Sequence, residues 1–205
     1  MGSVLLVRHG QASAGAVDYD VLSELGVAQA RHLGYAWEAS DWRPTVALSG
    51  SLLRHHQTAV ATLDVLGDVD GYDVDPGWNE IDHQPLPGQP AAAAGLTFAE
   101  RNRGWSNGDP SGAETFAEFR ARVLAAFDRA CAEAGSGRSV VVFTSGGPIA
   151  MVTTHLLGGD AEMWLRLAPV VINASVTTAV VGGSGRTLIS FNEHTHVPIP
   201  DLTYH

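Results

Sequence analysis

The tripeptide Arg8-His9-Gly10 directly follows a short apolar run, Val4 to Val7. Such a run is typical of a central parallel strand that is covered on both faces, and in open α/β sheets ligands bind beyond the carboxyl ends of the strands. The arginine offers planar donors suited to phosphate or carboxylate, the histidine a nitrogen nucleophile or base, and the glycine close access to the backbone. The tripeptide alone does not decide between such an anion site and an ordinary surface Arg-His pair.

Two later segments also place polar residues at the ends of expected strands. Ser49-Gly50-Ser51 follows a strand over 46–49 and precedes Arg54, and Thr144-Ser145-Gly146-Gly147 follows a strand over 139–144. The carboxyl ends of strands in a doubly wound sheet converge on one crevice. We therefore expect these residues and Arg8-His9 to form one site.

The remaining pattern alternates helices with strands and predicts the fold class α/β. It predicts a three-layer α/β/α sandwich with a mostly parallel, doubly wound central sheet. Ser23 is the expected N-cap of the first helix, and in the 113–134 helix Glu118 is expected to pair with Arg122. The expected helices cover 24–40, 52–66, 113–134 and 149–157, and residues 176–181 and 187–191 form a hairpin.

Residues 82–112 differ from the rest of the chain in composition and hydrophobic pattern. They contain several prolines and glycines, and only one short helix is expected, near 98–103. A segment of this length exceeds an ordinary connection, which predicts an active-site lid or insert within a single domain, 1–205. The alternative is a surface excursion held by one aromatic residue. The candidate substrate contacts in this segment are Phe98, Arg101, Arg103 and Trp105.

Composition narrows the class of protein. The 205 residues are 45% hydrophobic, as in one globular domain, and the formal net charge of −10 argues against nucleic acid and anionic membranes as partners. The single cysteine, Cys131, excludes an internal disulfide framework and falls on an apolar helix stripe, so we expect it in the core. No Cys/His spacing fits a zinc site, and no cofactor is expected. The N-terminus shows no signal peptide, so a cytoplasmic location is expected.

Together, the ordered motifs resemble the histidine phosphatase superfamily, which has the phosphoglycerate-mutase-like fold. The resemblance runs in order through nearly the whole chain and is far more specific than any one motif. The matching segments are Leu6 to Ala12, Leu22 to Gly26, Ser49 to Ala59, Gly112-Ala113-Glu114 with Arg122, Gly146 to Ile149, and Asn192 to His196.

The resemblance implies a role for each candidate residue. His9 would attack phosphorus and form a phosphohistidine, while Arg8 and Arg54 would bind the phosphoryl oxygens. Glu80 matches the general acid, with Asp82 as the alternative, since like charge beside a bound phosphate favours a protonated carboxyl. Further phosphate or substrate contacts are expected from Gly10, Gln11, Ser13, Gly146 and Gly147, and no metal is implied.

Ser145 departs from the family pattern. The family usually has Ser-His-Gly-Gly where this chain has Thr144-Ser145-Gly146-Gly147, so a serine replaces the second pocket histidine. Charge-assisted hydrogen bonds are roughly twice as strong as neutral ones, so we expect an active enzyme that is slower or specialised. The histidines that could substitute are His55, His83, His155 and His196.

The favoured function is a phosphatase acting on a small phosphomonoester or on a phosphorylated protein side chain. A phosphoglycerate mutase is less favoured because Ile81 to Pro85 replaces the mutase-type segment. A third alternative is a non-catalytic phosphate-ligand sensor that keeps Arg8 and Arg54 for binding. Serine hydrolysis fits poorly, since the segment around Ser145 lacks the first glycine of a nucleophile elbow. The exposed face of the 113–134 helix could pair with a second subunit in a homodimer.

Overall fold

The computed structural model describes residues 1–13, 20–67, 71–81, 98–108, 114–135 and 137–204. Its centre is a six-stranded sheet in the order β3-β2-β4-β1-β5-β6. The four strands β1, β2, β3 and β4 run parallel to one another, whereas β5 is antiparallel to both β1 and β6. This confirms the expected mostly parallel sheet. The strands are β1 Gly2–Arg8, β2 Val46–Ser49, β3 Asp73–Val74, β4 Ser139–Thr144, β5 Val176–Gly182 and β6 Gly185–Glu193.

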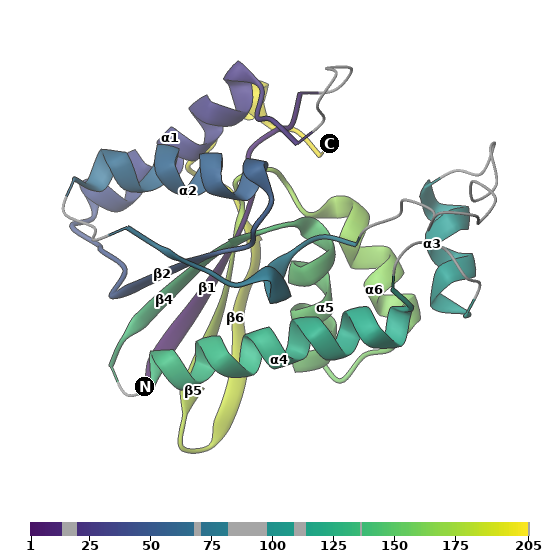
Figure 1. Ribbon diagram of the computed structural model, residues 1–205. Coiled ribbons are helices and arrows are strands. Elements are labelled where there is room, and N and C mark those ends of the chain that lie inside the picture. The colour runs from purple at the N-terminus through teal and green to yellow at the C-terminus, as the bar shows by residue number, and fades with distance from the viewer. Residues whose placement is uncertain (14–19, 68–70, 82–97, 109–113, 136, 205) are drawn as a thin grey trace.

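Helices cover both faces of this sheet, as the three-layer prediction requires (Figure 1). α1 (Glu24–Ala39) and α2 (Leu53–Leu66) pack together on one face. α4 (Phe116–Ala134) and α5 (Gly146–Leu156) lie on the other. α6 (Ala161–Leu167) follows α5, and α3 (Phe98–Ser106) lies beside α6 at the end of the molecule remote from β3.

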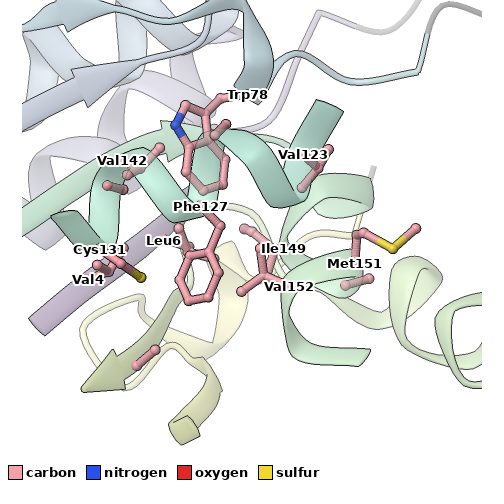
Figure 2. Close-up of a cluster of buried hydrophobic side chains, with 14 of the residues drawn as sticks. Val4, Leu6, Trp78, Val123, Phe127, Cys131, Val142, Ile149, Met151 and Val152 are labelled. Atoms are coloured by element: carbon pink, nitrogen blue, oxygen red, sulfur yellow. The ribbon is translucent and has the colours of Figure 1, made fainter. Parts of the chain in front are cut away.

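The central strands bury side chains on both faces, which is why their sequences are apolar without alternation. Val4 and Leu6 belong to a core cluster with α4 and α5, whereas Val7 belongs to a second cluster with α1 and α2. In the first cluster, Phe127 of α4 projects toward the sheet between β1 and α5 (Figure 2). Cys131 is 3% exposed in the same cluster, as expected. Two filled cores therefore fix the plane of the sheet and the position of its carboxyl edge.

Local capping explains where the helices begin. Ser23 caps α1 by accepting a hydrogen bond from Gly26 N, as predicted. α4 begins at Phe116 with Thr115 as N-cap, and Glu118 completes a capping box with Thr115. The expected Glu118–Arg122 pair is therefore wrong.

α5 begins at Gly146, three residues earlier than predicted. Pro148 lies in its first turn, where a missing N–H costs no intrahelical bond. The two glycines that were expected in a turn are therefore part of the helix, and their N–H groups point out of its N-terminal end.

The described part of the 82–112 segment corrects one expected substrate contact. Trp105 is 1% exposed, packs against Phe119 and Trp164, and donates from Nε1 to the carbonyl of Glu114 at 2.9 Å. This aromatic anchors α3 instead of facing a substrate. Residues 82–97 and the side chains of Phe98 and Arg101 lie outside the described residues.

Arg103, another expected substrate contact, forms an ion pair on the surface. It pairs with Glu162 of α6 at 2.8 Å, and both side chains are well exposed. Among the described helices, none is long and apolar enough to cross a membrane.

Candidate active site

His9 lies immediately beyond β1 and is held by its main chain. Its N–H donates to Thr144 O of β4 at 2.8 Å, and its carbonyl accepts from Asn173 Nδ2 at 3.0 Å. The ring nitrogen Nδ1 lies 2.7 Å from Gly10 O. A carbonyl can only accept, so Nδ1 carries the proton and the lone pair of a neutral ring lies on Nε2.

The surroundings of His9 keep this ring neutral. Burial lowers the pKa of His9 well below its ordinary value, and the positive charges of Arg8 and Arg54 lower it further. The ring of His55 adds a smaller effect in the same direction and has its centroid 5.9 Å away. A neutral imidazole with a fixed tautomer can act as a nucleophile at neutral pH.

Two arginines flank the histidine from different elements. Arg8 ends β1, and its guanidinium donates to the main-chain carbonyls of Val171 and Tyr204, the latter at 3.1 Å. Arg54 lies in the first turn of α2, is 9% exposed, and pairs with Asp20 at 2.7 Å. Asp20 also accepts from Leu53 N at 2.8 Å, where a helix N-terminus favours negative charge. The structure thus brings both predicted arginines to His9.

Glu80 lies at the N-terminal end of α5. Its Oε2 accepts from Gly147 N at 3.0 Å, and its Oε1 accepts from Ile81 N at 3.0 Å. A Cβ on residue 147 would lie 2.1 Å from Glu80 Oε1, so only glycine allows the carboxyl to lie here. Glu80, Gly146 and Gly147 are therefore together, as predicted, whereas Asp82 lies outside the described residues.

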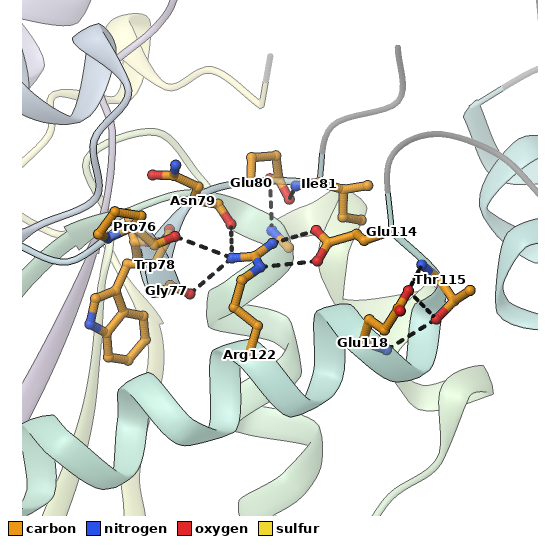
Figure 3. Close-up of polar contacts among 12 residues, drawn as sticks. Pro76, Gly77, Trp78, Asn79, Glu80, Ile81, Glu114, Thr115, Glu118 and Arg122 are labelled. Carbon is orange, nitrogen blue, oxygen red and sulfur yellow. Dashed lines mark hydrogen bonds and ion pairs between the residues drawn. The ribbon is translucent and has the colours of Figure 1, made fainter. Parts of the chain in front are cut away.

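Arg122 holds the segment that carries Glu80. Its Nη1 donates to the carbonyls of Gly77 and Asn79 at 2.9 and 3.0 Å, at the 3₁₀ turn Pro76–Trp78 (Figure 3). Its Nε and Nη2 donate to the two oxygens of Glu114 at 3.0 and 2.5 Å. Arg122 thereby links α4 to the main chain on which Glu80 lies.

Ser145 and His55 are in direct contact at the same edge of the sheet. Both are 0% exposed, and Ser145 Oγ lies 2.6 Å from His55 Nε2. Burial lowers the pKa of His55 well below its ordinary value, and Arg54 and His56 lower it further, so this ring is also neutral. Of the histidines considered as substitutes, His55 is thus the one that the structure brings to Ser145.

The other candidate histidines lie elsewhere or outside the described residues. His155 is ten residues along α5 from Ser145, or about 15 Å at 1.5 Å per residue, and lines a separate cavity of about 300 Å³. His196 Nε2 donates to Ala174 O at 2.9 Å, next to Asn173, which bonds the carbonyl of His9. His83 lies outside the described residues.

The predicted phosphate contacts after His9 have structural partners. Gly10 N donates to Thr58 Oγ1 at 3.1 Å, and a Cβ on residue 10 would lie 2.2 Å from Gly26 O. The Gln11 side-chain oxygen accepts from Ser23 Oγ at 2.9 Å, so this side chain is engaged with the start of α1. Ser13 N donates to Val21 O at 2.7 Å.

Sequence reasoning missed the support that comes from late in the chain. Asn173, which bonds His9 O, accepts from Thr203 Oγ1 at 2.9 Å, and Thr203 Oγ1 accepts from Gln29 Nε2 at 2.8 Å. Neither spacing nor an adjacent motif marks Asn173 or the carbonyl of Tyr204. Asp20 had a weak signal, since it lies just before the motif Leu22 to Gly26.

Within the described residues, no three His, Cys, Asp or Glu side chains are grouped in a way that could hold a metal ion. Arg8 and Arg54 lie beside His9, and α5 begins at the same edge of the sheet with its main-chain N–H groups, a set of donors that suits an oxyanion. The arrangement combines a neutral nucleophile, two cations and a carboxyl. These are the parts that phosphoryl transfer to a side chain requires.

Comparison with known proteins agrees with this chemistry. The model of the histidine phosphatase superfamily (branch 1) matches residues 4–194. No curated protein sequence matches the chain. The match extends from within β1 to the residue after β6, so it includes Arg8, His9, Arg54, Glu80 and Ser145.

Solved structures with the same fold include three phosphatases. A phosphoserine phosphatase of Entamoeba histolytica, solved with phosphoserine, has a TM-score of 0.73 at 18% identity, covering 97% of this chain and 100% of that one. A mycobacterial glucosyl-3-phosphoglycerate phosphatase has a TM-score of 0.69 at 24% identity, with 95% and 100% covered. A putative α-ribazole-5′-P phosphatase of Escherichia coli has a TM-score of 0.72 at 21% identity, with 94% and 97% covered. At these identities the likeness shows the fold.

Proposed function

Because this chain belongs to the histidine phosphatase superfamily, we propose that it hydrolyses phosphomonoesters through a phosphohistidine on His9. The observation that carries the proposal is the state of the His9 ring. Its Nδ1 is held 2.7 Å from Gly10 O and its pKa is lowered, which leaves a neutral Nε2 for attack. Arg8 and Arg54 lie beside it, where they can bind the phosphoryl oxygens.

In the first step, His9 Nε2 attacks phosphorus and the ester P–O bond breaks. Glu80, protonated in the substrate complex, gives its proton to the departing oxygen, so the alcohol leaves neutral. Arg8 and Arg54 stabilise the negative charge that spreads over the three equatorial oxygens of the transferring group. The main-chain N–H group of Gly146 at the start of α5 adds a further donor for these oxygens, while that of Gly147 donates to Glu80.

In the second step, water attacks phosphorus and the N–P bond breaks, returning the electron pair to His9 Nε2. Glu80, now a carboxylate, takes the proton of that water. The products are the alcohol and inorganic phosphate, and the enzyme regains its starting protonation. Hydrolysis therefore needs no metal or redox partner, in keeping with the oxyanion-binding donors of this site.

The substrate that we propose is a small phosphomonoester. The three phosphatases of the same fold are named for phosphoserine, glucosyl-3-phosphoglycerate and α-ribazole-5′-phosphate, which are all of this kind. A phosphorylated protein side chain remains the alternative. A cytoplasmic location and a homodimer also remain predictions, and light scattering tests the second.

Turnover of p-nitrophenyl phosphate by wild type and His9→Ala tests the proposal. We expect the His9 variant to lose at least about a thousandfold in kcat, because the nucleophile is removed. Rapid quenching of wild type should trap phosphate that is released by acid and survives alkali, as expected for an N–P bond. His56→Ala is the control, since His56 contacts Tyr72 instead of the site.

Two results would contradict the proposal. Turnover that survives His9→Ala would exclude His9 as nucleophile. Phosphate binding that depends on Arg8 and Arg54, with no turnover of several phosphomonoesters, would indicate the phosphate sensor instead.

A further inference from the structure

We propose that His55 and Ser145 form a relay in which His55 Nε2–H donates to Ser145 Oγ and thereby directs the serine hydroxyl proton to a phosphoryl oxygen. His55 is a positioning residue in this arrangement, and Ser145 is the group that touches the substrate. The inference rests on the proposed phosphatase function, and it assigns the work of a cationic donor to two neutral side chains.

The first observation is that Ser145 is not used as a helix cap. It occupies the N-cap position of α5, where a serine oxygen ordinarily accepts from the N–H two or three residues ahead, but its side chain makes no capping bond. Glu80 accepts from Gly147 N in its place. The Ser145 hydroxyl is therefore available for a different contact, and it makes one with His55 at 2.6 Å.

The second observation is the position of Ser145 relative to His9. β1 and β4 pair in parallel with Arg8 opposite Thr144, so His9 and Ser145 are the next residues on two adjacent strands. Adjacent strands lie about 4.8 Å apart, and His9 N donates to Thr144 O at 2.8 Å. A phosphoryl group on His9 would thus lie beside the Ser145 side chain.

The third observation is that the chain makes room for the His55 ring. A Cβ on residue 50 would lie 2.3 Å from His55 Nδ1, so a side chain at Gly50 would displace the ring. His55 is itself fully buried, with its ring centroid 5.9 Å from that of His9. Burying a polar ring costs free energy unless the ring is hydrogen-bonded, so a residue that only filled space here would be apolar.

The tautomer follows from the partners of the two ring nitrogens. Among the residues described, His55 Nδ1 has no hydrogen-bond partner and is inaccessible to solvent. Buried N–H groups without an acceptor are rarer than buried acceptors without a donor, so the proton belongs on Nε2. Nε2–H then donates to Ser145 Oγ, and the serine hydrogen must point to a third group. The phosphoryl oxygen supplies that acceptor when substrate is bound.

A double-mutant cycle on p-nitrophenyl phosphate turnover tests the relay, using Ser145→Ala, His55→Ala and the double variant. Removing one transition-state donor should lower kcat about a hundredfold, with a much smaller change in KM. His55→Ala should give a comparable loss of kcat because the hydroxyl loses its direction. The double variant should be no slower than Ser145→Ala alone, since the two residues act as one unit.

Two further variants separate the relay from a packing role. His55→Gln keeps an N–H donor near Ser145 Oγ and should recover part of the kcat that His55→Ala loses. His56→Ala, the adjacent histidine on α2, should keep wild-type kcat and KM. Thermal unfolding of each variant shows whether the fold is kept.

The outcomes are distinct. Independent, multiplying losses in the double variant, or wild-type kcat in His55→Ala, would overturn the relay while leaving the phosphohistidine mechanism in place. Equal kcat of His55→Gln and His55→Ala would also count against a directed N–H. A wild type that shows no turnover would overturn the proposed function, and this inference with it.

Discussion

The two neutral histidines are the residues that most distinguish this site. His9 and His55 are both buried beside Arg54, and the same features lower the pKa of each: first desolvation, then neighbouring positive charge. An additional cation at this place would be unfavourable next to Arg8 and Arg54. The neutral Ser145–His55 contact therefore suits a pocket that already holds two guanidinium groups.

We expect the free energy of unfolding to fall as pH is lowered below about 6.5, the ordinary pKa of histidine. The unfolded chain binds protons at His9 and His55 in this range, whereas the folded protein does so only at much lower pH. Each histidine contributes a slope that approaches about 1.4 kcal/mol per pH unit as pH falls below 6.5, and its contribution to stability is fully present well above pH 6.5. Urea unfolding of wild type and His55→Gln between pH 7.5 and 5 measures how the free energy of unfolding depends on pH. The free energy of unfolding of the variant should depend on pH less steeply than that of wild type. Equal slopes would contradict the prediction.

Gly147→Ala should lower kcat about a hundredfold. The added Cβ would lie 2.1 Å from Glu80 Oε1, so the carboxyl must move, and misplacing a catalytic group by about 1 Å has an effect of this size. At Gly146 the Cβ would have no neighbour closer than 3.4 Å, so Gly146→Ala should lose much less. Steady-state kinetics of both variants compare the two positions. Similar losses would indicate that helix conformation, not Glu80, is responsible.

Among the structural elements, α4 does more than cover the sheet. Its first turns carry Arg122, which donates to two carbonyls of the 76–79 segment and to Glu114 (Figure 3). Since Glu80 follows that segment directly, α4 sets the position of the carboxyl without touching substrate. Arg122 also lies over the ring of Phe119, an earlier residue of the same helix, with its guanidinium carbon 5.2 Å from the ring centroid, on the side of α4 that contacts the 3₁₀ turn.

Arg122→Ala should reduce kcat about tenfold or more while changing KM little, because the Glu80 segment loses its fixed position. Removing a partner of the Glu114 carboxylate should also lower the free energy of unfolding by about 1–3 kcal/mol. Arg120→Ala is the matched control, since Arg120 is exposed on the same helix. Kinetics together with urea unfolding separate the two effects. An unchanged kcat in a destabilised Arg122 variant would limit Arg122 to a structural role.

Local sequence signals predict a helix or strand correctly where a capping residue or an apolar run alone determines its ends. Ser23 and Gly67 mark the ends of α1 and α2 as expected, and β4 has the predicted bounds. The start of α5 was misplaced because two glycines and a proline resemble a turn, although a proline fits a first helical turn. The i, i+4 rule predicts that Arg122 pairs with Glu118, but Glu118 is bonded to Thr115 in the capping box. Arg122 therefore pairs with Glu114.

Over the whole molecule, one end depends on a cluster of aromatic rings. Trp105 of α3 meets Phe116, Phe119 and Trp164, so α3, α4 and α6 share one anchor. Trp105→Ala should lower the free energy of unfolding by about 3–5 kcal/mol, as for other buried aromatics. Arg103→Ala, which removes an exposed ion pair nearby, should cost at most about 1 kcal/mol. Urea unfolding measures both, and equal losses would contradict the burial argument.

The location of the site was predictable from topology, whereas its internal contacts were not. A parallel sheet brings the ends of β1, β2 and β4 to one edge, so His9, Arg54 and Ser145 had to be near each other. The ring of His55 reaches Ser145 only because residue 50 has no side chain, and Asn173 reaches His9 across 164 residues. Such contacts depend on packing between distant segments, which no local pattern in the sequence encodes.

The position of the sole cysteine allows its thiol to report how often the core of the protein becomes exposed to solvent. Cys131 lies in the core between α4 and the sheet (Figure 2), and burial raises the pKa of its thiol to about 11. Thiol reagents react with the thiolate and need access to it, so the folded protein should be inert to them. The rate at which a chromogenic disulfide labels the protein would then report how often the core exposes α4. Any variant designed for the active site could be checked in the same way, without attaching a label.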